Sequence, residues 1–473
     1  MEPIQTDLVV IGAGPGGYAA AFHAADLGKK VLLIERDPRL GGVCMNRGCI
    51  PSKALLNASH MITAARESAH RGITFGEPRI ELDKLRLWKD SILEKLGSGI
   101  ASLAKMRGVT VLHGRAHFET STTLRVETSQ GQQYIQFTNA IIAVGSRPAL
   151  PKAFDLGNPR VMTSTEALEM ADIPEKLLLV GGGYIGMELG TVYASMGSQV
   201  TVVEAVEALL TGADPDLIRP VAAYAKKAFK EVRLKAKVLE MKTSAKQIKV
   251  TIDYNGQKLE EYYDRVLVSV GRIPNGQDLG LENTAVQKDD KGFIRVDEKM
   301  TTTDPNIFAI GDVAGGIMFA HKASKEARIA VDNIAGEGHS VNRDYLIPAV
   351  IFTDPEVAWV GLTETEAKAK GIPIEVAKFP WGASGRALTY DRTDGLTKLI
   401  IDPSTERILG VGIVGHGAGE LIGEGTVAIE MGATVHDLAQ IVHPHPTLSE
   451  TLMEGAEVFF GHSTHVFTRK KTH

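Results

Sequence analysis

The chain has 473 residues, of which 44% are hydrophobic and 23% charged, with a formal net charge of −5. These values are ordinary for a globular protein and indicate about three domains. They exclude a basic field that would attract nucleic acid or anionic lipid, and no run of about 20 unbroken apolar residues predicts a membrane span. The first residues resemble neither a signal peptide nor a transit peptide, so we expect the reducing cytoplasm.

The first predicted strand, residues 6–11, leads into a glycine-rich turn and an alanine-rich helix. Gly12, Gly14 and Gly17 fit the spacing G-x-G-x-x-G, which allows a tight turn, a close approach to pyrophosphate and close helix–strand packing. Glu35 ends the next predicted strand, where a carboxylate can accept a hydrogen bond from a ribose hydroxyl. The pattern predicts a dinucleotide-binding unit, and its alternative is an ordinary glycine-rich turn.

The only two cysteines, Cys44 and Cys49, lie close together in GGVCMNRGCIPSK. A disulfide closing so short a loop adds only about 2 kcal/mol, and a zinc site needs further ligands. Redox exchange fits better. We expect a loop that leads to Pro51 in the first turn of a helix, so that the helix N-terminus stabilises a thiolate on Cys49. Lys53 lies on the same helical face as Cys49, although it could also be a solvated surface lysine.

The glycine pattern returns in residues 176–204. Gly181, Gly183 and Gly186 repeat the spacing, and Glu204 ends the following strand. An acidic residue there, with no arginine nearby for a 2′-phosphate, favours NAD over NADP. The alternative is that one of the two copies is a degenerate structural repeat.

Further along the chain, residues 140–148 and 265–275 look like counterparts after the two units, and residues 306–316 predict a buried strand that ends in Gly-Asp. The cysteine segment resembles the active-site segment of the pyridine nucleotide–disulfide oxidoreductases, and the other segments of the chain fit the same family. GRIPN, AIGDVAGG, FPWGASGRAL and HPHPTLSE follow in the family's order, so the resemblance covers essentially the whole chain. The departures are Val43 and Met45, where Thr and Leu are commoner, and Arg47, which adds a charge.

The resemblance implies an α/β fold with two Rossmann-like dinucleotide-binding domains, for FAD and NAD, and a C-terminal α+β dimerisation domain. The expected division is 1–148 for the FAD domain, 149–273 for the NAD domain, 274–345 for a central segment that returns to the FAD domain, and 346–473 for the interface. The implied FAD contacts are Gly12, Gly14, Gly17, Glu35, Lys53, Gly114, Asp312 and Ala320. The implied NAD contacts are Gly181, Gly183, Gly186, Glu204, Val238 and Gly271. No metal is expected.

The resemblance also implies the reacting groups. Cys44 is expected to exchange with the substrate, Cys49 to lie next to the flavin, and Lys53 to pair with Glu188. His445 resembles the family's catalytic base. A base is needed because a thiol with a pKa near 8.5 is mostly protonated at pH 7.

Glu450 is expected to orient His445, but a competing interpretation exists. Thr447 and Glu450 fit a helix-capping box, and we expect that one carboxylate cannot fully serve both roles. His443 is expected to support the site rather than to catalyse.

The implied reaction reoxidises dihydrolipoamide groups of 2-oxo acid dehydrogenase complexes or of the glycine cleavage system. Electrons would pass through the cysteine pair and FAD to NAD⁺. Expected partners are a second copy of the chain, whose site His445 and Glu450 complete, and lipoyl domains, but neither nucleic acid nor membrane.

Other members of the family should carry different sequence features. A glutathione reductase should carry basic residues near Glu204, a mercuric reductase an extra cysteine pair, and a peroxide or oxygen reductase a single cysteine. A scaffold subunit with decayed chemistry is the alternative from another class, and a colourless purified protein would favour it.

Overall fold

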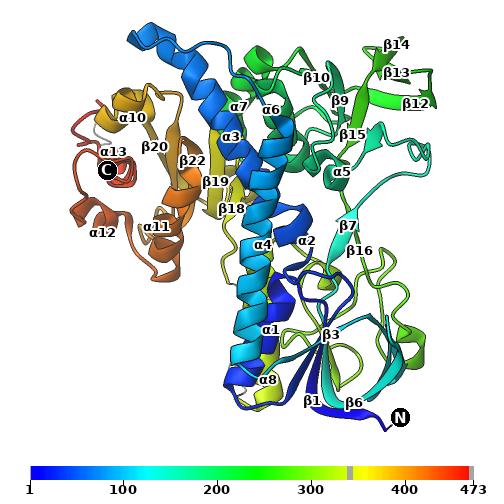
Figure 1. Ribbon diagram of the computed structural model, residues 1–473. Coiled ribbons are helices and arrows are strands. Elements are labelled where there is room, and N and C mark those ends of the chain that lie inside the picture. The colour runs from blue at the N-terminus through cyan, green and yellow to red at the C-terminus, as the bar shows by residue number, and fades with distance from the viewer. Residues whose placement is uncertain (1, 338–344, 468–473) are drawn as a thin grey trace.

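The computed structural model describes residues 2–337 and 345–467, which form several sheets covered by helices (Figure 1). The first sheet has seven strands in the order β3-β2-β1-β6-β5-β4, and β17 also pairs with β6. Its central strands are parallel, and the paired stretches Leu8–Ile11 of β1 and Val31–Ile34 of β2 are continuous in apolar residues, as strands covered on both faces are. The strands are β1 (Ile4–Ile11), β2 (Val31–Glu35), β3 (Thr110–His113), β4 (Arg115–Thr120), β5 (Thr123–Thr128), β6 (Gly131–Ile142) and β17 (Ile307–Ala309).

The second unit repeats the parallel arrangement in the order β11-β10-β9-β15-β8. These strands are β8 (Val161–Met162), β9 (Lys176–Val180), β10 (Gln199–Val203), β11 (Glu231–Arg233) and β15 (Arg265–Val268). An antiparallel sheet stands beside it, made of β12 (Lys237–Thr243), β13 (Ile248–Tyr254) and β14 (Gln257–Tyr263). A short ribbon of β7 (Ser146–Pro148) and β16 (Arg272–Pro274) joins the two units.

Beyond this ribbon the chain returns to the first sheet, because β17 pairs in parallel with β6. The last sheet is antiparallel, in the order β18-β19-β22-β21-β20. Its strands are β18 (Ala349–Ile351), β19 (Glu356–Gly361), β20 (Glu375–Pro380), β21 (Leu396–Ile401) and β22 (Ile408–Gly415). The expected α/β fold, with two dinucleotide-binding units and a C-terminal α+β domain, is therefore present.

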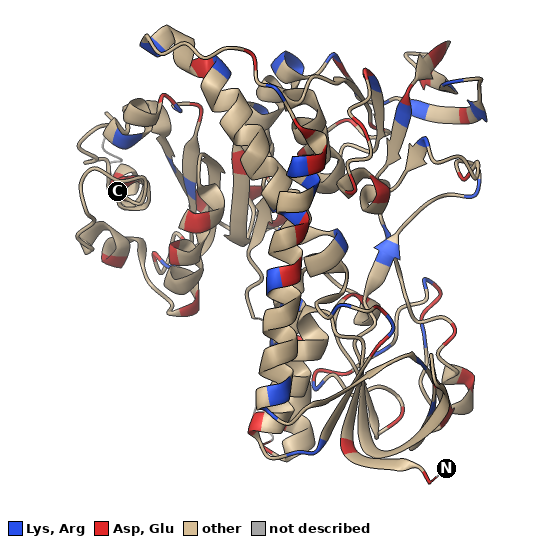
Figure 2. Ribbon diagram, in the orientation of Figure 1, with Lys and Arg blue, Asp and Glu red and all other residues tan. Residues whose placement is uncertain are grey.

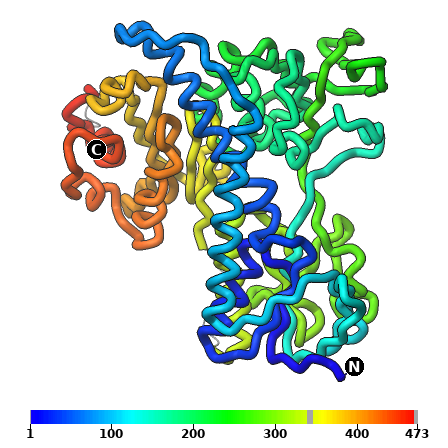
Figure 3. The backbone as a smooth tube through the Cα atoms, viewed as in Figure 1, coloured from blue at the N-terminus to red at the C-terminus, as the bar shows by residue number. Residues whose placement is uncertain are grey.

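The helix that begins at Cys49 packs between the units. Leu55 and Leu56 of this helix belong to one buried cluster with side chains of the second parallel sheet and of the C-terminal sheet. It runs beside the long α4 (Figure 3). The first helices are α1 (Pro15–Asp26), α2 (Gly42–Arg47), α3 (Cys49–Glu67), α4 (Leu82–Met106), α5 (Ser164–Leu168), α6 (Tyr184–Ser195) and α7 (Pro215–Ala228). The later ones are α8 (Ala320–Ala335), α9 (Glu364–Lys370), α10 (Gly385–Tyr390), α11 (Ala418–Glu430), α12 (Val435–Gln440) and α13 (Glu450–Phe460).

One local expectation was wrong. The segment around Cys44 was expected to be a loop, but it forms the short helix α2, which ends at Gly48.

Lys and Arg are interspersed with Asp and Glu along the described chain, for example down α4 (Figure 2). None of the described helices has the length and apolarity to cross a membrane.

Candidate active site

The turn between β1 and α1 requires glycine at two positions. Gly12 has φ +98°, and a Cβ there would lie 2.6 Å from the carbonyl O of Ala143. A Cβ on Gly17 would lie 1.8 Å from the carbonyl O of Gly12, so the helix could not approach the strand. The N-terminal amides of α1 are thereby held at the end of β1, where a pyrophosphate binds favourably.

The second glycine turn has the same geometry. Gly181 has φ +104° and would place a Cβ 2.6 Å from the carbonyl O of Ser269, and a Cβ on Gly186 would lie 2.5 Å from that of Gly181. A Cβ on Gly183 would meet no atom within 4 Å, which leaves room for a ligand at the start of α6. The second copy therefore keeps the shape of a binding turn.

Two carboxylates at the ends of corresponding strands contact the glycine turns: Glu35 is the last residue of β2, and Glu204 directly follows β10. Glu35 accepts a hydrogen bond from Ala13 N at 2.8 Å, and Glu204 accepts one from Gly182 N at 2.6 Å. Gly114 N donates to the carbonyl O of Glu35 at 2.9 Å, which brings Gly114 beside the first carboxylate. Each unit thus combines an open helix N-terminus with a carboxylate, the donor and acceptor set that a dinucleotide requires.

A cavity of about 710 Å³ extends from the first glycine turn to the cysteines. It brings together most of the residues expected around FAD, and a cradle of this size fits such a group. The expected residues that line it are Gly12, Gly14, Glu35, Cys44, Cys49, Lys53, Gly114, Glu188, Asp312 and Ala320. Gly17 lies behind the turn, and none of the residues expected around NAD lines this cavity.

The two cysteine sulfurs are in contact, 2.6 Å apart, with Cys44 on α2 and Cys49 at the start of α3. The hydrogen bond from Cys44 lowers the pKa of Cys49 to about 7; burial opposes this, and the Lys53 ammonium assists it. The same hydrogen bond, together with burial, raises the pKa of Cys44. The surroundings therefore favour a thiolate on Cys49 and a protonated thiol on Cys44.

Lys53 and Glu188 form the expected pair, with Lys53 Nζ 2.8 Å from Glu188 Oε2. The Glu188 side chain is 4% exposed, and its other oxygen accepts from Phe352 N at 3.0 Å. The Lys53 ammonium also lies 4.3 Å from the centroid of the Phe352 ring. These contacts join α3, α6 and the segment after β18, and they fix Lys53 at the wall of the cavity.

Sequence reasoning missed the residues that hold Asp312. Ser146 donates a hydrogen bond to Asp312, and Arg272 Nε donates to Ser146 Oγ at 2.7 Å. Lys322 Nζ donates to the carbonyl O of Gly315 at 2.8 Å and holds the following turn. Ser146 and Arg272 lie in the paired strands β7 and β16. The correspondence of residues 140–148 with 265–275 was the available signal.

Glu450 makes a contact that belongs to each of the two competing roles, but the capping role is only half fulfilled. One carboxylate oxygen lies 2.9 Å from His445 Nδ1, and the other accepts from Thr447 N at 2.7 Å. The capping box is incomplete, because α13 starts at Glu450 with Ser449 as its N-cap and Thr447 Oγ1 donates to the carbonyl O of Pro444. Burial opposes ionisation of Glu450, but Thr447 N–H and the His445 ring outweigh it and lower the pKa of Glu450.

Three expected residues lie away from the cysteines. His445, just before α13, does not line the cavity, and α13 is far from α2 within one chain (Figure 1). Val238 lies on β12, half-buried against the antiparallel sheet. Gly271 precedes β16 with φ +133°. One chain therefore does not bring His445 to Cys44.

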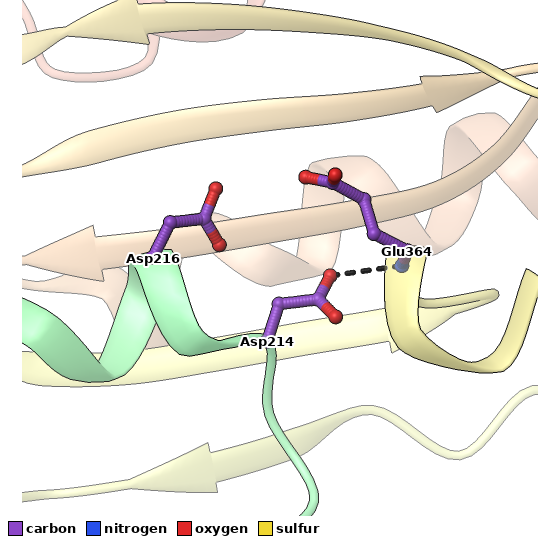
Figure 4. A group of neighbouring side chains, drawn as sticks. All are labelled: Asp214, Asp216 and Glu364. Atoms are coloured by element: carbon purple, nitrogen blue, oxygen red, sulfur yellow. Dashed lines mark hydrogen bonds between the residues drawn. The ribbon is translucent and has the colours of Figure 1, made fainter. Parts of the chain in front are cut away.

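Among the described residues, one acidic group has the spacing of metal ligands: Asp214, Asp216 and Glu364 (Figure 4). The ammonium of Lys398 lies 2.7, 2.8 and 2.9 Å from an oxygen of each of them, respectively. Lys398 thus occupies the centre where a cation would bind. We interpret the group as a buried ion-pair cluster that joins α7, α9 and β21.

Comparison with known proteins identifies the family. Residues 6–327 match the model of pyridine nucleotide-disulphide oxidoreductases, and residues 347–456 match that of their dimerisation domain. The chain is 46% identical over 461 residues to a dihydrolipoyl dehydrogenase of Vibrio cholerae, with 97% of each chain covered. It is 44% identical over 466 residues to a dihydrolipoyl dehydrogenase of Bacillus subtilis, with 98% of each covered.

Solved structures agree with this family. LpdA of Mycobacterium tuberculosis has a TM-score of 0.88 at 26% identity, covering 96% of this chain and 99% of that one. The Cu(II) complex of the HOCl-induced flavoprotein disulfide reductase RclA of Escherichia coli has a TM-score of 0.86 at 28% identity, covering 97% and 99%. From the two family models and relatives of nearly equal length, the chain belongs to the pyridine nucleotide–disulphide oxidoreductase family, whose cofactors are FAD and NAD.

Proposed function

We propose that this protein is a dihydrolipoyl dehydrogenase, which oxidises dihydrolipoamide with NAD⁺. The observation that carries the proposal is the contact between Cys44 and Cys49 at the wall of the cavity that the first glycine turn also lines. It is supported by relatives of that name at 43–46% identity over nearly the whole chain.

In the first half of the reaction, one substrate thiol attacks Cys44 Sγ of the oxidised pair. His445 accepts the proton of this thiol, and Glu450 holds the imidazole in place. The Cys44–Cys49 bond breaks, a mixed disulfide forms on Cys44, and Cys49 leaves as a thiolate. The second substrate thiol then displaces Cys44, which releases lipoamide and leaves both cysteines reduced. The lowered pKa of Cys49 suits it to be the leaving group.

In the second half, the cysteine pair loses two electrons and its disulfide forms again, while NAD⁺ takes up a hydride and one proton is released. FAD, when bound, supplies the two-electron relay between Cys49 and the nicotinamide. The residues that would hold it are those expected from the sequence: Gly12, Gly14, Gly17, Glu35, Lys53, Gly114, Asp312 and Ala320. Gly181, Gly183, Gly186, Glu204, Val238 and Gly271 would hold NAD.

We further propose that residues 1–148, 149–273, 274–345 and 346–473 divide the chain as expected, and that His445 and Glu450 complete the site of a partner chain. The distance of α13 from α2 supports this arrangement, as does the match to a dimerisation domain. The natural electron donors would be lipoyl domains of 2-oxo acid dehydrogenase complexes or of the glycine cleavage system, in the cytoplasm.

The test is NADH formation when the purified, FAD-loaded protein meets dihydrolipoamide and NAD⁺. We expect rapid turnover in the wild type and its loss in Cys44→Ser, because the attacked sulfur is absent. NADP⁺ in place of NAD⁺ should support little turnover, since Glu204 would repel a 2′-phosphate. A flavin-containing wild type that does not oxidise dihydrolipoamide would refute the proposed substrate.

A further inference from the structure

A second His–Glu pair lies near the start of the loop of residues 441–449, which also carries His445. His443 Nε2 lies 2.6 Å from Glu424 Oε1 on α11, and its Nδ1 lies 2.9 Å from the carbonyl O of Ile441. Within one chain the His443 side chain is 4% exposed, whereas that of His445 is 73% exposed. The same short segment therefore buries the imidazole of His443 and exposes the imidazole of His445 to solvent.

Both ring nitrogens of His443 face oxygen atoms. With both nitrogens engaged within the chain and the ring buried, His443 is not placed to contact a substrate. Its contacts instead restrain the backbone of the loop.

Glu424 provides a rigid anchor for this restraint. α11 packs on the C-terminal sheet against β19 and β22. The contact is close, because a Cβ on the neighbouring Gly425 would lie 2.9 Å from Val411. The loop of residues 441–449 is thus tied to α11 near its start and, through Glu450, to α13 at its end.

We propose that His443 and Glu424 are positioning residues, which orient the imidazole of His445 for proton exchange with the thiols at Cys44. This inference rests on the proposed function for the identity of the substrate, but not for the geometry of the loop. Glu450 alone fixes the ring of His445 through Nδ1. His443 fixes the backbone two residues before it, so that Nε2 is presented at one angle.

The first test compares four variants of the FAD-loaded protein. We expect His443→Gln and Glu424→Ala each to lower kcat for NADH formation from dihydrolipoamide about tenfold or more, because small misplacements of a reacting group are costly. The double variant should lose no more than either single variant, as coupled residues do. Glu424→Gln keeps an acceptor for the His443 ring and should retain most of the activity.

The matched control is His70→Gln. His70, which follows α3, pairs with Asp391, which follows α10, and both lie outside the loop of residues 441–449, so its removal should leave kcat unchanged. Reduction of ferricyanide by NADH requires the cofactor sites but no proton transfer by His445, and it should be unchanged in every variant. Its loss in parallel with kcat would reveal general damage and overturn the proposal.

A second measurement does not involve lipoamide. In the reduced protein, alkylation of Cys44 by iodoacetamide is followed against pH by peptide mass spectrometry. We expect the midpoint for Cys44 to move to higher pH in His443→Gln, towards its value in His445→Gln. If the wild type does not oxidise dihydrolipoamide but this shift is present, the proposed function fails and the inference stands. A midpoint and a kcat equal to those of His70→Gln would overturn the inference.

Discussion

At the residue scale, the ionisation of Cys49 depends on two neighbours. Cys44 donates a hydrogen bond to its sulfur, and the Lys53 ammonium stabilises negative charge there, so the pKa of Cys49 falls to about 7 although burial opposes ionisation. Lys53 is itself held by Glu188 at 2.8 Å. At neutral pH a substantial fraction of Cys49 is therefore thiolate, which is the form that leaves from a disulfide and forms it again.

Replacing Lys53 by Met should raise the pKa of Cys49. The substitution removes a positive charge that favours the thiolate, so the thiolate should form at higher pH than in the wild type. The measurement is the ultraviolet thiolate absorbance of the reduced protein against pH, taken as the difference from Cys49→Ser. Lys84→Met, which removes an exposed lysine paired with Glu81 on α4, is the control. Identical titrations of the two lysine variants would contradict the assignment.

Arg47, the charged departure from the family pattern, forms an ion pair with Asp37. Both residues line the cavity of the glycine turn and also a second cavity of about 880 Å³ beside α4. The pair thus forms part of the wall between the two cavities. It connects α2, which carries Cys44, to the segment after β2, which carries Glu35.

We expect Arg47→Val to weaken the retention of FAD. Without the ion pair, the wall beside the expected adenosine end of the cavity opens, so bound FAD should dissociate several-fold faster. The release is followed by the fluorescence of free FAD after dilution. Arg39→Ala is the control, because Arg39 pairs with Glu94 and lines only the second cavity. Equal release rates in the two variants would show that the ion pair does not retain FAD.

Residue roles could be predicted only where a motif fixes them locally. The glycine spacing predicts the contacts of Gly12 and Gly17, because turn, strand and helix are consecutive in the chain. Both candidate roles of Glu450 were recognised, but a spacing does not reveal that the two oxygens of its carboxylate contact different partners. The Glu424–His443 pair depends on how α11 packs beside the following loop, which no local pattern contains.

At the scale of elements, the buried cluster around Lys398 holds the second unit against the C-terminal sheet. The Lys398 side chain is 1% exposed, and its ammonium contacts carboxylates at the starts of α7 and α9. A second lysine, Lys378 on β20, also pairs with Asp216 and Glu364, but its side chain is 41% exposed. The sequence positions of these groups are far apart, so the cluster could not be predicted before the sheets were assembled.

Lys398→Met should destabilise the fold by about 3–5 kcal/mol, because it leaves the buried carboxylate of Asp214 without its lysine partner. Lys378→Met should cost only about 0–1 kcal/mol, as expected for a partly exposed pair. Urea unfolding at fixed protein and FAD concentrations measures both. Equal effects of the two variants would contradict the central role of Lys398.

The pH dependence of this effect follows from the carboxyl pKa values. Burial opposes ionisation of Asp214 and Asp216, but their hydrogen bonds to lysines outweigh it and lower both pKa values. The stability that they contribute is present above their unfolded pKa, about 4, and is lost as pH falls through the lower folded pKa. In Lys398→Met the lysine no longer offsets burial at Asp214, so the folded pKa of Asp214 should rise above its unfolded value. The destabilisation should therefore be smaller at about pH 5 than at about pH 7, and one that does not shrink would argue against charge as its cause.

At the scale of the whole molecule, one chain presents an incomplete site. The cysteines line the cavity, whereas His445 does not, and its side chain is 73% exposed. Helix α13, which follows His445 in the chain, lies apart from α2 (Figure 1). The match to a dimerisation domain supports the proposed arrangement, in which a twofold dimer would bring each His445 to the cysteines of the other chain. Only the family resemblance predicted this arrangement. Nothing in the sequence around the cysteines indicates that they meet His445, and nothing around His445 indicates that it meets the cysteines.

Mixed dimers of two inactive variants should therefore regain activity. In a dimer of Cys44→Ser with His445→Gln, one of the two sites combines intact cysteines from one chain with an intact His445 from the other. Random pairing makes half of the dimers mixed, each with one working site, so co-expression should restore about a quarter of the wild-type activity. The measurement is NADH formation by the co-expressed pair against each variant alone. If His445 served its own chain, both chains of the mixed dimer would stay defective, and activity would not exceed that of the single variants.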